Sequence, residues 1–158
     1  MYHYIECGLD NVYLTNGYVI KQTPYGEGVS VQDVPGLHRM IALTLARKRG
    51  AITHKEFRFL RGYLLMSQKG LGQLVGVDEQ TISLWERARR KIAPASEAVV
   101  RLLVMDSANG REEVKRIIDR MNTVERLVNQ HIVASESKKS WATKLVDAPT
   151  QALVAEPA

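Results

Sequence analysis

The sequence predicts an α+β protein, with a small N-terminal antiparallel β region, a mostly helical domain and a long C-terminal helix. Strand-favouring residues broken by turn signals fill residues 1–34. From residue 35 onward, apolar residues recur at the three- and four-residue steps of helices. The charge changes at the same place: residues 1–35 carry one Lys or Arg against four Asp or Glu, a net charge of −3.

The β region is predicted from runs of tyrosine, valine, isoleucine and threonine. Asn16-Gly17 favours a two-residue hairpin turn, because Asn-Gly accepts the two positive φ angles that such a turn needs. We therefore expect this turn to join the second and third strands. The expected strands cover residues 2–6, 11–15 and 18–23, with a further short strand at 29–31.

The first two helices are predicted from capping signals and apolar spacing. One begins near Pro35 behind the cap Asp33 and is expected to end at Gly50, a residue that accepts the left-handed conformation. Thr53 and Glu56 form the pattern of a capping box, which opens the next helix. That helix is expected to carry its apolar side chains at Phe57, Leu60, Leu64 and Leu65.

Three shorter segments follow the same logic. Ser67 is expected to cap a helix that ends at Gly76, and Asp78 is expected to cap the next one. Pro94 and Ser96 mark the start of a fifth helix in the helical domain, which covers residues 35–107. Ala108-Asn109-Gly110 then interrupts the helical pattern.

The C-terminal part is predicted to hold one long helix over residues 111–132. Its apolar residues alternate at three- and four-residue steps, which is the spacing of a short coiled-coil seam. The seam could join two copies of the chain, or the helix could pack on its own domain. Beyond residue 135 the periodicity is lost, and residues 135–158 are expected to form a disordered tail. The seam residues are Val114, Ile117, Met121, Val124 and Val128.

Composition excludes several classes of protein. No apolar run approaches the roughly 18 residues of a membrane span, and no secretion signal is evident at the start. The single cysteine, Cys7, cannot form an internal disulfide, and the four histidines show no spacing typical of a metal site. No residue pattern of a known catalytic site is present. We therefore expect a cytoplasmic protein without cofactor, metal or enzymatic activity.

The excess positive charge is confined to the middle third of the chain. Residues 36–91 carry twelve Lys or Arg against four Asp or Glu, a net charge of +8, whereas residues 92–158 carry nine of each. Such a block indicates either binding to a polyanion such as nucleic acid or an ordinary solvated basic face.

Residues 53–94 have the organisation of a helix-turn-helix unit. A helix capped by Ser67 is followed by a tight turn at Gly76 and by a helix whose apolar residues, Ile82 and Trp85, would hold it to the core. Its opposite side would then face outward, where a DNA major groove would lie.

This stretch resembles the Xre/Cro type of helix-turn-helix transcriptional regulators over about 40 residues. The resemblance is carried by Glu56 to Arg61, Leu65 to Gln68, Leu71 to Val77 and Gln80 to Glu86. In this family the second helix of the unit, here the one capped by Asp78, is the recognition helix. The resemblance implies that residues at its start read base edges and that basic residues around it contact phosphates. The implied base-reading residues are Glu79, Gln80, Thr81, Ser83 and Leu84. The residues implied to contact the DNA sugar–phosphate backbone are Gln68, Lys69, Arg87, Arg89, Arg90 and Lys91. Ala88 stands where the family usually has glycine.

A second resemblance covers the N-terminal part. Residues 7–14, 25–28 and 36–39 are similar to regulators grouped with MqsA-type antitoxins, although the zinc-binding cysteine pairs are absent. Together the resemblances imply a homodimeric repressor that binds double-stranded DNA at a pseudo-palindromic operator. The alternative function is that of an antitoxin-like module whose N-terminal region binds a toxin.

Overall fold

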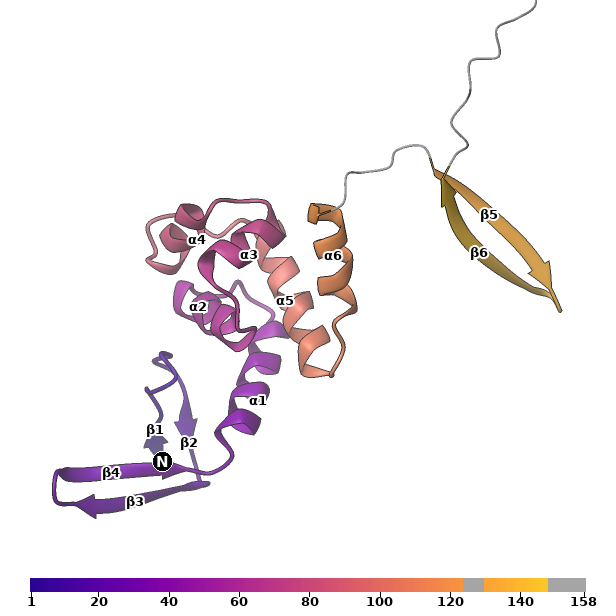
Figure 1. Ribbon diagram of the computed structural model, residues 1–158. Coiled ribbons are helices and arrows are strands. Elements are labelled where there is room, and N and C mark those ends of the chain that lie inside the picture. Colours follow the sequence, from indigo (N-terminus) through magenta and orange to yellow (C-terminus); the bar gives the residue numbers. More distant parts are fainter. Residues whose placement is uncertain (124–129, 148–158) are drawn as a thin grey trace, which may run out of the picture. The chain divides into compact units, whose positions relative to one another are not determined.

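The computed structural model describes residues 1–123 and 130–147, and it confirms the α+β class (Figure 1). The chain divides into two units, residues 1–122 and residues 123–158, which are described separately below. The described part of the chain holds six helices and three two-stranded antiparallel sheets. It contains no helix that is both long and apolar enough to cross a membrane.

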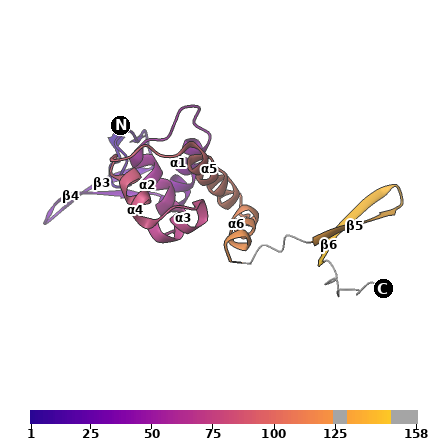
Figure 2. The ribbon, with the colours of Figure 1, turned by 90° about the horizontal axis from the view of Figure 1, so that it is seen from above.

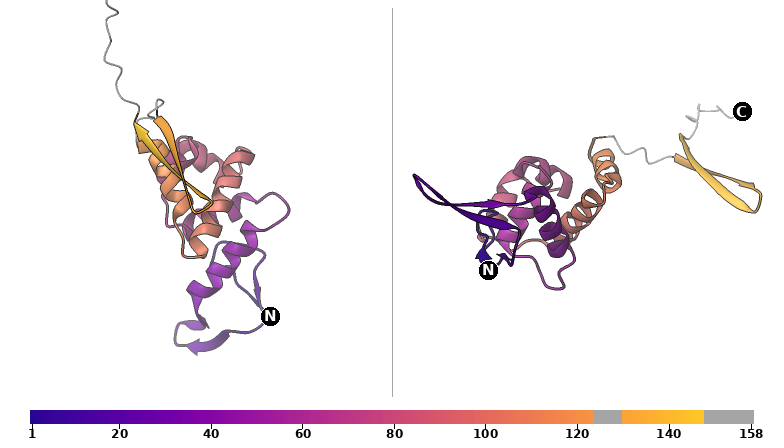
Figure 3. Two further views of the ribbon diagram at one scale, coloured as in Figure 1. Left: turned by 90° about the vertical axis from the view of Figure 1, so that its right-hand side faces the viewer. Right: turned by 90° about the horizontal axis from the view of Figure 1, so that it is seen from below.

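The N-terminal strands pair differently from the prediction. β1 (Tyr2–His3) pairs with β2 (Tyr13–Leu14), and β3 (Tyr18–Thr23) pairs with β4 (Gly26–Val31). The predicted hairpin turn at Asn16-Gly17 is therefore wrong, since β2 and β3 lie in different sheets. Of these two residues only Gly17 has a positive φ, 76°, whereas the expected turn needs two. A turn at residues 24–25 instead joins β3 to β4. Figures 2 and 3 show this hairpin projecting from the helices.

The predicted helix caps are confirmed, because each capping side chain accepts the expected backbone hydrogen bond. Asp33 accepts from the N–H of Gly36, Ser67 from that of Gly70 and Asp78 from that of Thr81, and Thr53 forms the capping box with Glu56. These caps fix where the helices begin. The helices of the first unit are α1 (Val34–Ala46), α2 (His54–Tyr63), α3 (Gln68–Val75), α4 (Glu79–Glu86), α5 (Pro94–Ala108) and α6 (Glu113–Thr123).

Two predicted helix ends are wrong. α1 ends at Ala46 with Arg47 as its C-cap, and Gly50 lies in the following loop without a positive φ. α2 ends at Tyr63, so Leu65 does not join its apolar face. Leu65 instead takes a left-handed conformation with φ 55° and is 94% exposed. A short loop and a tight turn therefore stand where the apolar pattern predicted continued helix.

The core of the first unit lies between α1, α2, α3, α4 and α5, and the most extensive helix contacts are those of α3 with α4 and of α1 with α5. Phe57 on α2 is fully buried and meets Trp85 on α4 edge to face, with ring centroids 5.7 Å apart and planes at 89°. Leu9 brings the N-terminal β region into the same core. The other core members are Ala42, Leu45, Ala46, Ile52, Leu60, Leu71, Ile82, Val100 and Val104.

The C-terminal predictions are corrected. The expected helix over 111–132 is wrong at residues 130–132, because Gln130–Ser137 forms strand β5, which pairs with β6 (Ser140–Asp147). The expected disordered tail is wrong over 135–147 for the same reason. Residues 124–129, with Val124 and Val128 of the predicted seam, and residues 148–158 lie outside the described residues. In this hairpin Ile132 pairs with Leu145 and Ala134 with Thr143, on the same face.

Candidate nucleic-acid interface

α3 and α4 pack against each other across a short connection of residues 76–78. Gly76 ends α3 with φ 77°, a left-handed angle that glycine adopts without steric cost. The N–H of Val77 then donates to the carbonyl of Gly72 at 2.9 Å. A Cβ added at Gly72 would lie 2.6 Å from the carbonyl oxygen of Val77, so glycine permits this close approach. The connection thus sets the angle between the two helices tightly.

Asp78 begins α4 and stays ionised over a wide pH range. Hydrogen bonds from the side chain and the backbone N–H of Thr81 lower the pKa of the Asp78 carboxyl below its ordinary value of 3.8, and the charge of Arg90 acts in the same direction. A carboxylate at a helix N-terminus also interacts favourably with the helix dipole. The start of α4 is therefore capped by a charged group at neutral pH.

α4 buries one side and leaves the other accessible. Ile82, Trp85 and Glu86 are buried, at 0%, 3% and 8% exposed. Of the five predicted base-reading residues, Glu79 and Gln80 are exposed, and Thr81, Ser83 and Leu84 are half-buried. The first turn of α4 therefore offers two free polar side chains to a partner.

A charged network that the sequence analysis missed lies behind this surface. The guanidinium of Arg61 on α2 donates twice to the Glu86 carboxylate, from Nε at 2.5 Å and from Nη2 at 3.0 Å. It also donates from Nη1 to the carbonyl of Met66 at 2.8 Å. The side chains are nearly withdrawn from water, at 16% exposed for Arg61 and 4% for Glu86. A bidentate pair of this kind fixes geometry in addition to contributing energy.

Gln68, which was predicted to contact the DNA backbone, belongs to this network. Its amide nitrogen donates to Oε2 of Glu86 at 2.9 Å, so the side chain at the start of α3 is held against the end of α4. Arg61, Glu86 and Gln68 together connect α2, α3 and α4. The signal available in the sequence was Glu86 directly after Trp85, a carboxylate on the buried side of α4 that requires a partner.

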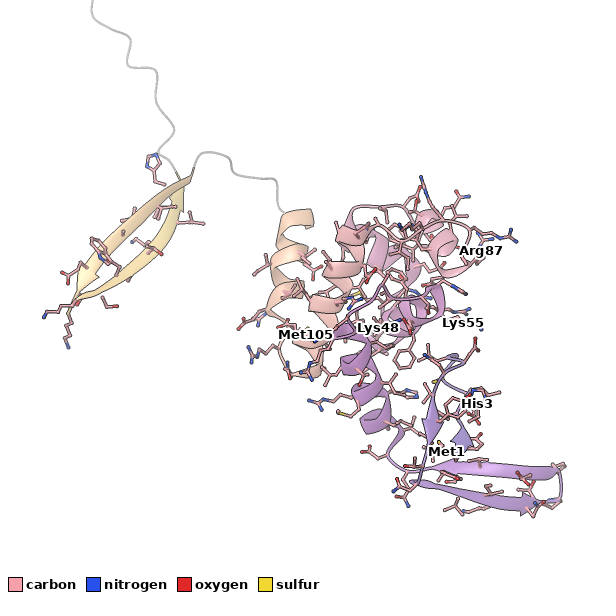
Figure 4. All side chains as sticks on the ribbon, turned by 180° about the vertical axis from the view of Figure 1, so that it is seen from behind. Met1, His3, Lys48, Lys55, Arg87 and Met105 are labelled. Carbon is pink, nitrogen blue, oxygen red and sulfur yellow. The ribbon has the colours of Figure 1, made fainter. Side chains whose placement is uncertain are left out.

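The predicted basic contacts lie at the start of α3 and directly after the end of α4. Lys69, Arg87, Arg89, Arg90 and Lys91 are all exposed. Arg87 donates from Nε to the carbonyl of Ser83 at 3.3 Å, which directs its guanidinium along the end of α4. Figure 4 shows Arg87 and Lys55 on the same side of the first unit, and both line one hollow there. Cationic side chains therefore extend from the end of α4 toward α2.

Ala88 adopts the conformation that glycine would take at this position. Its φ is 55°, and the turn is closed by hydrogen bonds from its N–H to Trp85 and from the N–H of Arg89 to Leu84. Left-handed backbone costs a non-glycine residue about 1–2 kcal/mol. The turn geometry is thus retained with a strained residue.

Replacing Ala88 with glycine is expected to raise the free energy of unfolding by roughly 0.5–1 kcal/mol, because relief of strain exceeds the entropy cost of glycine. Urea denaturation measures the change. Ala98→Gly is the matched control, since Ala98 is exposed within α5 and should lose roughly 0.5–1 kcal/mol. A loss of stability in both variants would contradict the strain at Ala88.

The N-terminal region is attached to the helices by polar contacts. The hydroxyl of Tyr4 lies 2.9 Å from Nε2 of His38, and Lys55 on α2 forms an ion pair with Asp10 at 2.5 Å. This hydrogen-bonded pairing lowers the pKa of the Asp10 carboxyl. Within residues 1–123 and 130–147, no three His, Cys, Asp or Glu side chains gather as metal ligands would, and Cys7 is a free thiol.

No family model matches the chain, and the searches of curated proteins and of solved structures found no significant match.

Proposed function

We propose that the protein is a sequence-specific DNA-binding transcriptional regulator of the helix-turn-helix class, acting in the cytoplasm. The observation that carries this proposal is the presentation of α4. Its inner side is buried at Ile82 and Trp85, its first turn exposes Glu79 and Gln80, and cations follow at its end. A helix of this kind can enter a major groove with its N-terminal residues against base edges.

Each group of residues has a role in this proposal. The amide of Gln80 can both donate to and accept from adenine, which makes it the main base-reading side chain. Glu79 can accept from cytosine. Arg87, Arg89 and Lys91 neutralise phosphates, which positions the protein without carrying sequence information. The network of Glu86 holds Gln68 at the start of α3, next to the same DNA surface.

We further propose that two copies bind a pseudo-palindromic operator and repress transcription, including that of their own gene, by occupying it. One such helix contacts only a few base pairs, so two half-sites about one helical turn apart are expected. Exposed apolar residues suit a dimer contact: Leu102 on α5 is 54% exposed and Ile117 on α6 is 60% exposed.

The test is a binding titration on the upstream DNA of the protein's own gene and on scrambled DNA at two salt concentrations. Gln80→Ala is expected to weaken binding to the upstream DNA by about 1–3 kcal/mol and to relax specificity at one base pair. Gln22→Ala on β3 is the matched control and should bind as the wild type does. Equal affinity of the wild type for both DNAs would contradict sequence-specific recognition.

An antitoxin-like role is the second candidate, favoured by the β3–β4 hairpin. Val19, Ile20 and Tyr25 are 48%, 51% and 101% exposed, on a region with a net charge of −3, which suits a basic protein partner. Co-purification of the full chain with the product of the adjacent gene tests this role. Ile20→Ser combined with Tyr25→Ser should abolish such binding and leave DNA binding intact.

A further inference from the structure

A basic cleft lies beside the end of α4, between the loop that joins α1 to α2 and the segment that follows α4. Five Arg or Lys side chains line it against a single carboxylate, that of Glu97. The cationic lining residues are Arg49 on one segment and Arg89, Arg90 and Lys91 on the other, with Arg101 from α5. Arg49 is not among the residues predicted from the sequence to contact DNA.

The loop that carries Arg49 is fixed from beneath by α5. The guanidinium of Arg101 donates to three backbone carbonyls: that of Ala46 at the end of α1, at 3.3 Å, that of Lys48, and that of Gly50, at 2.5 Å. Arg101 and Glu97 are mostly buried, with side chains 17% and 15% exposed. Because the loop is held in one conformation, it can present Arg49 without the entropy cost of ordering a mobile segment.

The single carboxylate in the cleft is already engaged. Glu97 accepts from Nε of Arg101 at 3.0 Å and from the backbone N–H of Ile52 at 3.2 Å. By contrast, the side chains of Arg49, Arg89 and Lys91 form no hydrogen bond or ion pair with any residue that the structure describes. Their positive charges therefore gather around one hollow without an internal counter-charge.

We propose that Arg49, together with Arg89 and Lys91, binds the DNA sugar–phosphate backbone in this cleft, which extends the contact beyond α4 onto the loop after α1. This inference rests on the proposed function and adds a second chain segment to it. The unpaired cationic side chains lie on both sides of the cleft. One small anion would not neutralise all of them, which favours a run of phosphates as the ligand.

The experiment measures the affinity of the full chain for the upstream and the scrambled DNA over a range of salt. Arg49→Gln is expected to weaken binding to both DNAs about 5-fold at low salt and to reduce the salt slope by about 0.9, the value for one lost phosphate contact. Arg49→Lys should retain the slope, because it keeps the charge. Lys21→Gln on β3 removes the same charge elsewhere and should leave the slope unchanged.

Several results would overturn the inference. If Arg49→Gln binds as the wild type does while the wild type still selects its upstream DNA, the cleft lies outside the contact and the proposed function stands. If the loss is confined to the upstream DNA, Arg49 reads bases and the phosphate role is wrong. If the wild type binds neither DNA, the proposed function and this inference fail together.

Discussion

Replacing Glu86 with alanine is expected to lower the free energy of unfolding by about 3–5 kcal/mol, because the buried Arg61 loses its partner. The Arg61 side chain is only 16% exposed, so water replaces the two lost hydrogen bonds from its guanidinium incompletely. Gln68 loses the acceptor of its amide in the same substitution. Since small domains are stable by only about 5–15 kcal/mol, this one change should remove a large share of the protein's stability. Chemical denaturation measures it.

Two further variants separate the charge pair from its surroundings. Glu79→Ala removes an exposed carboxylate from the same helix and should change stability by less than about 0.5 kcal/mol. The double variant Arg61→Met with Glu86→Leu replaces both charges by apolar groups, and it should recover most of the stability that Glu86→Ala loses. A double variant as unstable as Glu86→Ala would show that the loss does not come from an unpaired Arg61.

The same double variant also separates stability from DNA binding. If the network serves to hold Gln68 in place, the folded double variant should bind the upstream DNA more weakly than the wild type does. Unchanged binding would limit the network to a structural role.

The starts of α1, α2, α3 and α4 could be predicted from the sequence because each depends on a local hydrogen bond. Asp33, Thr53, Ser67 and Asp78 accept backbone N–H groups three residues ahead, and such a bond needs no information from the rest of the chain. Gly76 ends α3 for a similarly local reason. The side of α4 that faces outward followed from the apolar period, which placed Ile82 and Trp85 on the buried side.

Strand pairing could not be predicted in the same way, since it depends on contacts between segments. Asn16-Gly17 has the composition of a hairpin turn, yet β2 pairs back onto β1 and leaves β3 to pair with β4. In the C-terminal segment a helical pattern in the sequence runs up to a strand. The three- and four-residue steps at Val114 and Ile117 continue in the sequence as far as Val128, but residues from Gln130 onward pair with β6.

The exposed residues of the candidate site could be predicted from the sequence, whereas the contacts that support them could not. Exposure of Glu79 and Gln80 follows from helical period alone. The ion pair of Arg61 with Glu86 joins residues 25 positions apart, and the anchoring of residues 46–50 by Arg101 spans more than 50. The place of Glu86 on the buried side of α4 indicates that it needs a partner, but which residue supplies that partner is decided by how the helices pack.

Replacing Phe57 with alanine is expected to lower the free energy of unfolding by about 3–5 kcal/mol, because it opens a cavity in the centre of the core. Phe57 is fully buried and meets Trp85 edge to face, so it joins α2 to α4 through the core. The substitution should also loosen α4, which would appear as faster amide hydrogen exchange over residues 79–86.

Phe57→Leu and Phe59→Ala divide this effect into its parts. Phe57→Leu keeps most of the apolar volume and loses the ring pair with Trp85, which is worth about 0.5–1.5 kcal/mol beyond buried area, so its loss should be much smaller than that of Phe57→Ala. Phe59 is half-buried and faces His38 near the N-terminal region, so Phe59→Ala should destabilise less and leave exchange in α4 unchanged. If Phe59→Ala cost as much as Phe57→Ala, the contact that holds α4 would not lie at the Phe57–Trp85 pair. The presentation of Gln80 would then depend on how the N-terminal region packs against α2.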